Sequence, residues 1–212
     1  MKAVIFDVDG TILDTMPLWE TLAQKYLATK GIIVSDEINK RMLSFTVPQA
    51  ALCMREEYGL DMEAEEIEKQ ILKLTEDFYI KDAPLKNGIL SCIEYLYEKN
   101  IPMIVASSGI KDLIEAAFLR LGISGYFEKI FTGDKNSPEL FEECLSFLGA
   151  KADEVLLFED GMHAIQTAKK MGIKTVLVKD IQKNYEEIKN LSDYTLEDMK
   201  WKQFWPLPEV TP

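Results

Sequence analysis

Histidine, cysteine and long apolar runs are scarce in this sequence of 212 residues, and each scarcity excludes a class of function. A single histidine, His163, gives no basis for a zinc site or a catalytic histidine relay. No apolar run reaches the roughly 18 residues that a membrane helix needs, and the run after Lys2 is too short for a signal peptide, so we expect a cytoplasmic protein. Cys53, Cys92 and Cys144 are odd in number and far apart, as expected of reduced thiols with a structural role.

Basic residues are also in deficit, with 24 lysines and arginines against 36 aspartates and glutamates and a formal net charge of −12. This charge repels nucleic acids and anionic membranes, so we expect neither as a partner. A phosphorylated small molecule would bind only where a metal ion or a basic group reverses the local potential. The length suits one domain or a core with a smaller insertion, and we expect a monomer or at most a weak dimer.

Short apolar runs suited to buried strands alternate with amphipathic helical patterns from about residue 87 onward. The predicted strands are 3–6, 103–106, 129–131, 155–158, 175–178 and a short edge strand at 194–196. This alternation predicts an α/β fold, a doubly wound parallel sheet covered by helices, with ligands at the carboxyl ends of the strands. Beyond the last strand, Trp201, Phe204 and Trp205 are expected to pack onto the core.

A long helical interval separates the first two predicted strands, and it is too long for a crossover. We therefore expect a helical-bundle cap domain at 16–84, inserted into a core domain formed by 1–15 and 85–212. The connections at 11–15 and 82–88 are polar or contain proline and glycine, so they could serve as hinges. Such a bundle would form a lid over the carboxyl edge of the sheet.

The first predicted strand ends in Asp7-Val8-Asp9-Gly10-Thr11, an acidic pair followed by a glycine. In a strand-to-loop turn both carboxylates would point to one side, and Gly10 would let a ligand approach the backbone. Two adjacent carboxylates either bind a hard cation or split into one charged and one protonated member, and both outcomes suit phosphoryl transfer. An isolated Asp-x-Asp-Gly is also a common turn, so this segment alone does not decide between the two.

Three later strand ends carry groups that would complete a phosphate site. Ser107 and Ser108 could bind phosphate oxygens, although a serine there is also a common helix cap. Lys135 would supply a positive charge, although alone it would be interpreted as a solvated surface lysine. Glu159 and Asp160 could complete an oxygen shell for Mg²⁺, although acids at a helix start are also ordinary capping residues. The combination favours a site, because a parallel sheet brings its strand ends to one edge.

With these motifs the sequence resembles the haloacid dehalogenase-like (HAD) hydrolase superfamily. The resemblance is to the branch with a helical cap after the first motif, which includes β-phosphoglucomutase and phosphoglycolate phosphatase. Residues 7–15 are similar to the first motif and Ser107 to the second. Lys135 with 138–141 is similar to the third motif, and 159–165 to the fourth. The family usually has proline directly after the lysine, where this chain has Asn136.

The resemblance implies a role for each matched residue. Asp7 would attack phosphorus and form an aspartyl-phosphate, while Asp9 would protonate the leaving oxygen and later activate water. Mg²⁺ would be the cofactor, held by Asp7, the main-chain carbonyl of Asp9, and Asp160, with Glu159 adjacent. The substrate would contact Gly10, Thr11, Ser107, Ser108 and Lys135. The chemistry agrees, since a carboxylate nucleophile splits one hard displacement into two easier ones.

The activity that the resemblance implies is hydrolysis of a small phosphate monoester, such as a sugar phosphate, phosphoglycolate or a nucleoside monophosphate. A sugar-phosphate mutase is one alternative, although such mutases usually have valine in place of Thr11 and a cap-hinge histidine in place of Trp19. A catalytically silent interaction protein is another, and the intact Asp7, Asp9 and Asp160 argue against it. Dehalogenation is disfavoured, because those relatives need no metal and lack an acid like Asp9.

Overall fold

The structure is a computed structural model, and it describes residues 1–42, 45, 47–182 and 184–197. The predicted packing of Trp201, Phe204 and Trp205 therefore lies outside the described residues. Within the described ranges, no helix combines the length and the apolar character that a membrane crossing requires.

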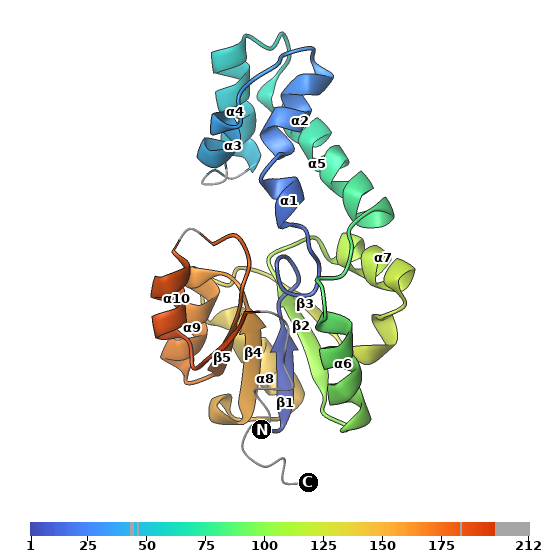
Figure 1. The fold of residues 1–212 in the computed structure, drawn as a ribbon, viewed down its shortest axis with the longest axis vertical. Helices are drawn as coiled ribbons and strands as arrows, with labels where there is room; N and C mark the ends of the chain where they lie inside the picture. Colours follow the sequence, from blue (N-terminus) through green and yellow to red (C-terminus); the bar gives the residue numbers. More distant parts are fainter. Residues whose placement is uncertain (43–44, 46, 183, 198–212) are drawn as a thin grey trace. The chain divides into compact units, whose positions relative to one another are not determined.

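A six-stranded parallel sheet is the centre of what we call the α/β unit, which comprises Met1–Asp14 and the chain from Pro84 onward. In chain order its strands are β1 (Ala3–Phe6), β2 (Met103–Ser107), β3 (Ile130–Thr132), β4 (Val155–Glu159), β5 (Lys174–Val178) and β6 (Tyr194–Leu196). Across the sheet the order is β3-β2-β1-β4-β5-β6, and every pairing is parallel (Figure 1). The predicted doubly wound α/β fold is confirmed, and each predicted strand end lies within one residue of its observed place.

The order of the strands places a topological switch point at β1. The chain passes from β1 to β2 and β3 on one side, and then returns to pair β4 with the other side of β1. In open α/β sheets, ligands bind in the crevice beyond the carboxyl ends of the strands at such a point. The carboxyl ends of β1 and β4 are therefore where a site is expected.

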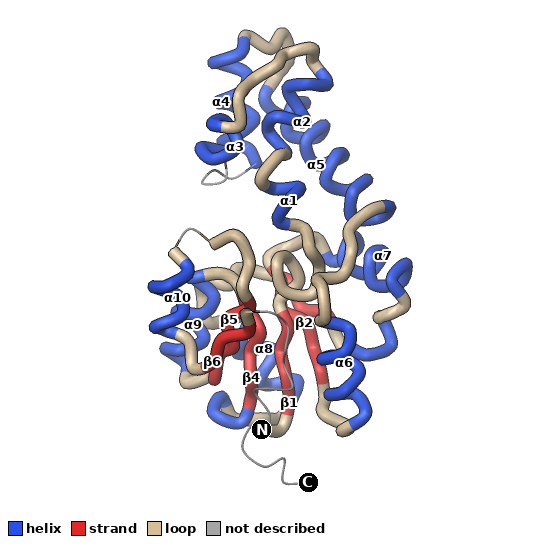
Figure 2. Tube along the Cα trace, viewed as in Figure 1, coloured by secondary structure: helices blue, strands red, loops and turns tan. Residues whose placement is uncertain are grey.

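Helices follow the strands of the α/β unit and cover the sheet (Figure 2). They are α6 (Ile89–Glu98), α7 (Lys111–Leu121), α8 (Glu139–Leu148), α9 (Met162–Met171) and α10 (Tyr185–Leu191). On one face of the sheet Ile5 and Leu157 belong to a buried cluster with Phe141 of α8 and Ala168 of α9. Burial of these apolar side chains provides the main driving force for the unit and holds the strand ends in register.

The helical unit, Thr15–Ala83, has a separate apolar core. It consists of α1 (Met16–Trp19), α2 (Leu22–Thr29), α3 (Glu37–Met42), α4 (Val47–Tyr58) and α5 (Ala64–Lys81). Tyr26 and Leu27 of α2 belong to one buried cluster with Met54 of α4 and Ile71 of α5. Pro48 lies in the first turn of α4, where the missing N–H of proline costs no intrahelical hydrogen bond.

Both chain connections to the helical unit are fixed to each other inside the α/β unit. The Asp14 N–H donates to the Pro84 carbonyl at 2.9 Å, and the Lys86 N–H donates to the Ile12 carbonyl at 2.8 Å. An antiparallel bridge between Leu13 and Leu85 lies between these two hydrogen bonds. The outgoing and returning segments therefore form a short two-stranded ribbon beside the first motif.

Candidate active site

The predicted site residues lie at the carboxyl ends of neighbouring strands. Asp7 directly follows β1, and Asp160 directly follows β4. Ser107 and Glu159 were expected just after their strands, but they are the last residues of β2 and β4. Their backbones still pair with Thr132 and Leu177 of the adjacent strands, which extends each strand by one residue. This leaves the side chains at the edge of the sheet.

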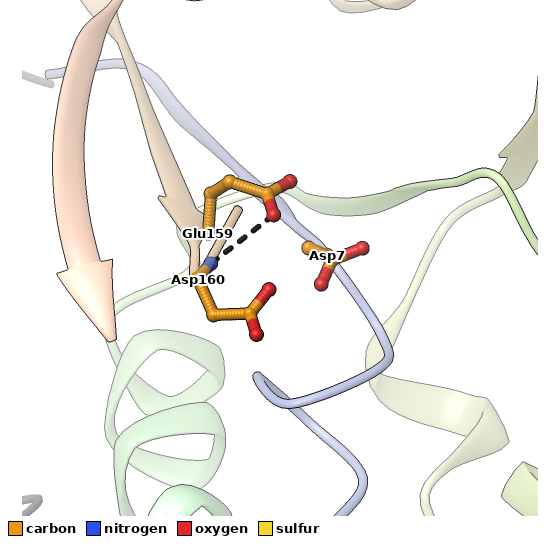
Figure 3. A group of neighbouring side chains, drawn as sticks. All are labelled: Asp7, Glu159 and Asp160. Carbon is orange, nitrogen blue, oxygen red and sulfur yellow. Dashed lines mark hydrogen bonds between the residues drawn. The ribbon is translucent and has the colours of Figure 1, made fainter. Parts of the chain in front are cut away.

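Three carboxylates converge where β1 and β4 end. Asp7, Glu159 and Asp160 each offer an oxygen, and these oxygens all lie within 4.8 Å of one another. Figure 3 shows the three carboxylates turned toward one shared space. Asp7 and Glu159 are almost fully buried, with 2% and 1% of their surface exposed. Buried carboxylates at such separations either take up protons or are compensated by a cation.

Lys135 supplies part of that compensation. It comes from the loop between β3 and α8, and its Nζ donates to Asp7 Oδ1 at 2.6 Å and to Glu159 Oε2 at 2.7 Å. Only 14% of the lysine side chain is exposed, so the alternative of a solvated surface lysine is wrong. The second oxygen of Glu159, Oε1, accepts from the N–H groups of Asp160 and Gly161 at 3.1 and 2.8 Å. Glu159 is therefore held on both sides.

The loop that carries Lys135 is shaped by the residues on either side of it. The Asp134 carboxylate accepts from the Asn136 N–H at 2.8 Å and from Asn136 Nδ2 at 2.7 Å. The Asn136 carbonyl accepts from Thr167 Oγ1 of α9 at 3.2 Å. Such an Asx turn constrains the backbone by hydrogen bonds where a proline would constrain it covalently. Asn136 thus gives Lys135 a defined loop without the proline of the family pattern.

The electrostatics of the cluster leave it short of positive charge. Burial raises the pKa of Asp7 to about 7, the charge of Glu159 adds to the rise, and Lys135 opposes it. Burial, followed by the charges of Glu159 and Asp7, raises the pKa of Asp160 well above its ordinary value. Burial acts to lower the pKa of Lys135, but Asp7 and Glu159 raise it above its ordinary value. One ammonium therefore faces three carboxylates, and a divalent cation bound through oxygen would complete the balance.

Asp9 and Ser107 both have side-chain oxygens close to Gly109. A Cβ placed on Gly109 would lie 3.1 Å from Ser107 Oγ and 3.6 Å from Asp9 Oδ2. Ser107 is buried and its Oγ accepts from the Gly109 N–H at 2.9 Å, whereas Ser108 is exposed. Thr11 is fully buried, and its Oγ1 has no hydrogen-bond partner among the described residues. The second acid of the first motif and the serine of the second motif therefore both border Gly109.

Gly10 is required by the geometry of the acidic cluster. Its φ is +77°, a conformation that favours glycine, and a Cβ there would collide with the Asp160 carboxylate. The same Cβ would lie 3.3 Å from Asp180 Oδ2. Close approach of the first-motif backbone to Asp160 therefore depends on the absence of a side chain.

Sequence reasoning missed Asp180, which follows β5 closely and pairs with Lys86 in the returning connection. The signal was present, since an acid after a buried strand had been noted at β1 and β4. Lys86 had no comparable signal, because it lies in a connection of no regular pattern. His163 is exposed on α9, outside the carboxylate cluster.

Comparison with known proteins identifies the family. A family model described as "Haloacid dehalogenase-like hydrolase" matches residues 4–178. The chain belongs to the haloacid dehalogenase-like hydrolases. The match extends from β1 to β5 and includes each of the strand ends described above. The predicted membership of the HAD superfamily is confirmed.

Individual relatives of this HAD hydrolase are distant but match most of its length. A Drosophila melanogaster protein named "Probable pseudouridine-5'-phosphatase" is 26% identical over 220 residues, covering 98% of this chain and 94% of the relative. The "Phosphorylated carbohydrates phosphatase" of Thermotoga maritima is 23% identical and covers 83% of this chain and 84% of its own. A solved Thermotoga maritima structure, provisionally assigned as a β-phosphoglucomutase, has a TM-score of 0.82 at 20% identity and covers 93% and 94% of the two chains. At this identity the structural likeness shows the fold alone.

Proposed function

We propose that this HAD hydrolase is a Mg²⁺-dependent phosphatase that releases phosphate from a small phosphate monoester through an aspartyl-phosphate on Asp7. The observation that carries the proposal is the buried Asp7 carboxylate at the β1/β4 switch point, 2.6 Å from the Lys135 ammonium and grouped with Glu159 and Asp160. The phosphatase names of the relatives from Drosophila melanogaster and Thermotoga maritima support the same reaction class.

The donor set fits Mg²⁺, which prefers oxygen ligands and is held by few carboxylates. Asp7, Asp160 and the main-chain carbonyl of Asp9 would hold the ion, with Glu159 beside them. When bound, the ion supplies positive charge that reduces the repulsion between Asp7 and the incoming phosphate. The raised pKa values of Asp7 and Asp160 support the need for such a charge.

In the first step, an oxygen of Asp7 attacks phosphorus as the bond from phosphorus to the ester oxygen breaks. Asp9 gives its proton to that departing oxygen, so the alcohol leaves neutral. Lys135 and Ser107 would hold the phosphoryl oxygens, which requires Lys135 to exchange part of its present pairing for the substrate. The products of this step are the alcohol and phosphorylated Asp7.

In the second step, Asp9 takes a proton from a water molecule as that water attacks phosphorus. The bond from phosphorus to the Asp7 oxygen breaks, and inorganic phosphate leaves. Asp7 is again a carboxylate and Asp9 is again protonated, so the cycle consumes one water and one ester. The family resemblance assigns this division of labour, and it is supported by the place of Asp7 in the carboxylate cluster and of Asp9 near Gly109.

The helical unit is proposed to act as a cap domain, 16–84, on the core domain 1–15 and 85–212. The connections at 11–15 and 82–88 would then serve as hinges, and closure would exclude bulk water from the acyl-phosphate.

A panel of phosphomonoesters assayed with Mg²⁺ tests the activity. The panel should include pseudouridine 5'-phosphate, sugar phosphates, phosphoglycolate and nucleoside monophosphates. We expect phosphate release from at least one compound, and a loss of at least about 10³-fold in Asp7→Asn. Asp77→Asn, the same change on the exposed face of α5, is the matched control and should behave as wild type. The absence of metal-dependent release from every compound would contradict the proposal.

A second assay separates a phosphatase from a mutase. Incubation with β-glucose 1-phosphate and a trace of the bisphosphate should give phosphate release or no reaction. Thr11, where mutases usually have valine, supports this expectation. Net formation of glucose 6-phosphate without release of phosphate would instead establish the mutase.

A further inference from the structure

A buried ion pair joins the returning connection to the loop after β5. The ammonium of Lys86 contacts Asp180 Oδ2, and only 13% of the lysine side chain and 4% of the aspartate side chain are exposed. The Lys86 backbone is also fixed, because its N–H donates to the Ile12 carbonyl at 2.8 Å. None of these groups has a part in the two chemical steps above. An ion pair this buried needs another reason for its presence, since burial makes such pairs expensive.

A glutamine links this pair to the metal-binding loop. The Asp180 N–H donates to Gln182 Oε1 at 2.8 Å. Gln182 Nε2 in turn donates to the main-chain carbonyl of Asp160 at 3.1 Å and to that of Val178 at 2.8 Å. The Gln182 side chain therefore spans the gap between the end of β5 and the residue that follows β4.

The side chains of Asp180 and Asp160 also both lie close to Gly10 of the first motif. A Cβ on Gly10 would collide with Asp160 and lie 3.3 Å from Asp180 Oδ2, the same oxygen that accepts from Lys86. Asp180 Oδ1 is occupied separately, because it accepts from the Ile181 N–H at 2.7 Å. Both oxygens of Asp180 thus have protein donors, so this acid is arranged as a fixed support and not as an open ligand.

We propose that Lys86, Asp180 and Gln182 are positioning residues for the metal ligand Asp160. Gln182 holds the main chain at residue 160, and the Lys86–Asp180 pair holds the Gly10 loop and the β5 loop on either side of it. This proposal rests on the proposed metal site. Partners that orient metal ligands in this way typically change metal affinity by 10- to 100-fold when they are removed.

The charge of Lys86 explains why the support does not disturb the site. Asp180 alone would add a further carboxylate near Asp160, whose cluster with Asp7 and Glu159 is paired with the single ammonium of Lys135. The Lys86–Asp180 ion pair as a whole carries no net charge, so it gives rigid support without adding negative charge to the site. An arginine at residue 86 would preserve this pairing, whereas a methionine of similar length would not.

Binding of Mn²⁺ to the full chain, followed by the electron paramagnetic resonance signal of the free ion, tests the proposal without relying on activity. We expect the dissociation constant to rise about 10-fold or more in Lys86→Met, Asp180→Asn and Gln182→Leu. Lys86→Arg should stay within about 3-fold of wild type. Lys169→Met is the matched control, because Lys169 makes an ion pair with Asp193 in the same unit at 2.5 Å, away from the carboxylate cluster.

Thermal melting of each variant in EDTA accompanies the titration. Weakened Mn²⁺ binding in the three variants, with recovery in Lys86→Arg, supports the positioning role. Variants that melt earlier but bind Mn²⁺ as wild type does would overturn it and assign these residues to stability alone. Equal weakening of Mn²⁺ binding in Lys169→Met would also overturn it.

If wild type itself fails to bind Mn²⁺, the proposed metal site is wrong and the positioning role is lost with it. If wild type binds Mn²⁺ but hydrolyses no ester, only the proposed function fails.

Discussion

The helical unit and the α/β unit bury different kinds of side chain. The helical unit buries hydrophobic side chains such as Tyr26 and Leu27, and one of its cavities, of about 220 Å³, is lined by apolar residues of α1 to α5 and Phe45. Asn39, one of its buried polar residues, has an ordinary packing role, because its side-chain oxygen accepts from the Gln24 N–H at 2.9 Å. The α/β unit instead buries Asp7, Glu159 and Lys135 at one edge of its sheet.

This difference in buried side chains distinguishes residues that stabilise the fold from residues that serve catalysis. Apolar burial stabilises each unit, whereas a buried cluster of like charges is weak support for stability and strong support for a ligand. The ion pairs of the helical unit illustrate this, because Lys73, Asp77 and Lys81 pair on an exposed face of α5, where such pairs contribute little. The following predictions test whether the two units differ in this way.

The largest expected effect is that of Lys135→Met, which leaves the buried carboxylates without their ammonium. In EDTA at pH 8 we expect the free energy of unfolding to fall by about 3–5 kcal/mol, since the remaining partners are uncompensated. Saturating Mg²⁺ should restore part of this loss. Denaturant unfolding measures both values, with Lys73→Met on exposed α5 as a control expected to change by less than about 1 kcal/mol. Equal losses of unfolding free energy in Lys135→Met and Lys73→Met would mean that Lys135 stabilises the protein no more than an exposed lysine does.

Leu27→Ala should be nearly as destabilising but for the opposite reason. Leu27 is fully buried in the helical unit, and its truncation leaves a cavity that costs about 3 kcal/mol. The affinity for Mn²⁺ should not change, because the proposed metal ligands belong to the other unit. Ile33→Ala, at a side chain that is 96% exposed, provides the control for losing an apolar residue. A weakened metal affinity in Leu27→Ala would show that the units are not independent.

Mg²⁺ should stabilise the α/β unit selectively. At a concentration 100 times its dissociation constant, a ligand that binds only the folded state adds about 2.7 kcal/mol. We expect this increment in wild type and its loss in Asp160→Asn, with Asp77→Asn as the control. Hydrogen exchange should show the added protection around the ends of β1 and β4. Protection gained mainly in α5 would place the ion elsewhere.

The sequence predicted the fold well because the strands are buried on both faces. Ala3–Phe6 is a continuous apolar run followed by Asp7, and Val155–Glu159 is apolar up to its last residue, Glu159, so both the existence and the ends of these strands could be recognised. The acids could be placed as well, because a parallel sheet brings its carboxyl ends together. The HAD resemblance then supplied roles that periodicity alone could not.

Long-range side-chain pairs could not be predicted in the same way. The contact of Lys135 with Asp7 depends on the turn made by Asp134 and Asn136, which is a local hydrogen-bond arrangement and not a pattern of hydrophobicity. Lys86 and Asp180 are far apart in sequence, and neither residue alone indicates its partner. The apolar stripe through Trp19 and Leu22 also gave no sign that α1 ends between them, because both residues face one core.

The smallest predicted effect concerns an ion pair of the α/β unit that lies outside the carboxylate cluster. Burial acts to raise the pKa of Asp193, but hydrogen bonds from Lys169 and Thr175 outweigh it and hold the pKa below its ordinary value. Because the folded-state pKa is lower than the unfolded one, this stabilisation is present above about pH 4 and is lost as the pH falls through the folded value. Wild type should therefore lose about 1 kcal/mol more than Asp193→Asn between pH 6 and pH 2 in urea unfolding.

Asp36→Asn serves as the control for this measurement, because Asp36 and Lys40 are 3.9 Å apart and both exposed. It should follow the pH dependence of wild type, and Asp193→Asn should retain the metal affinity and phosphate release of wild type. The Asp193 carboxylate, which is hydrogen-bonded to Thr175 of β5, would then affect stability without affecting phosphate release. If Asp193→Asn impaired metal binding, a partly buried ion pair anywhere in the α/β unit would be enough to influence the site. Metal binding would then not depend specifically on the cluster that contains Asp7 and Glu159.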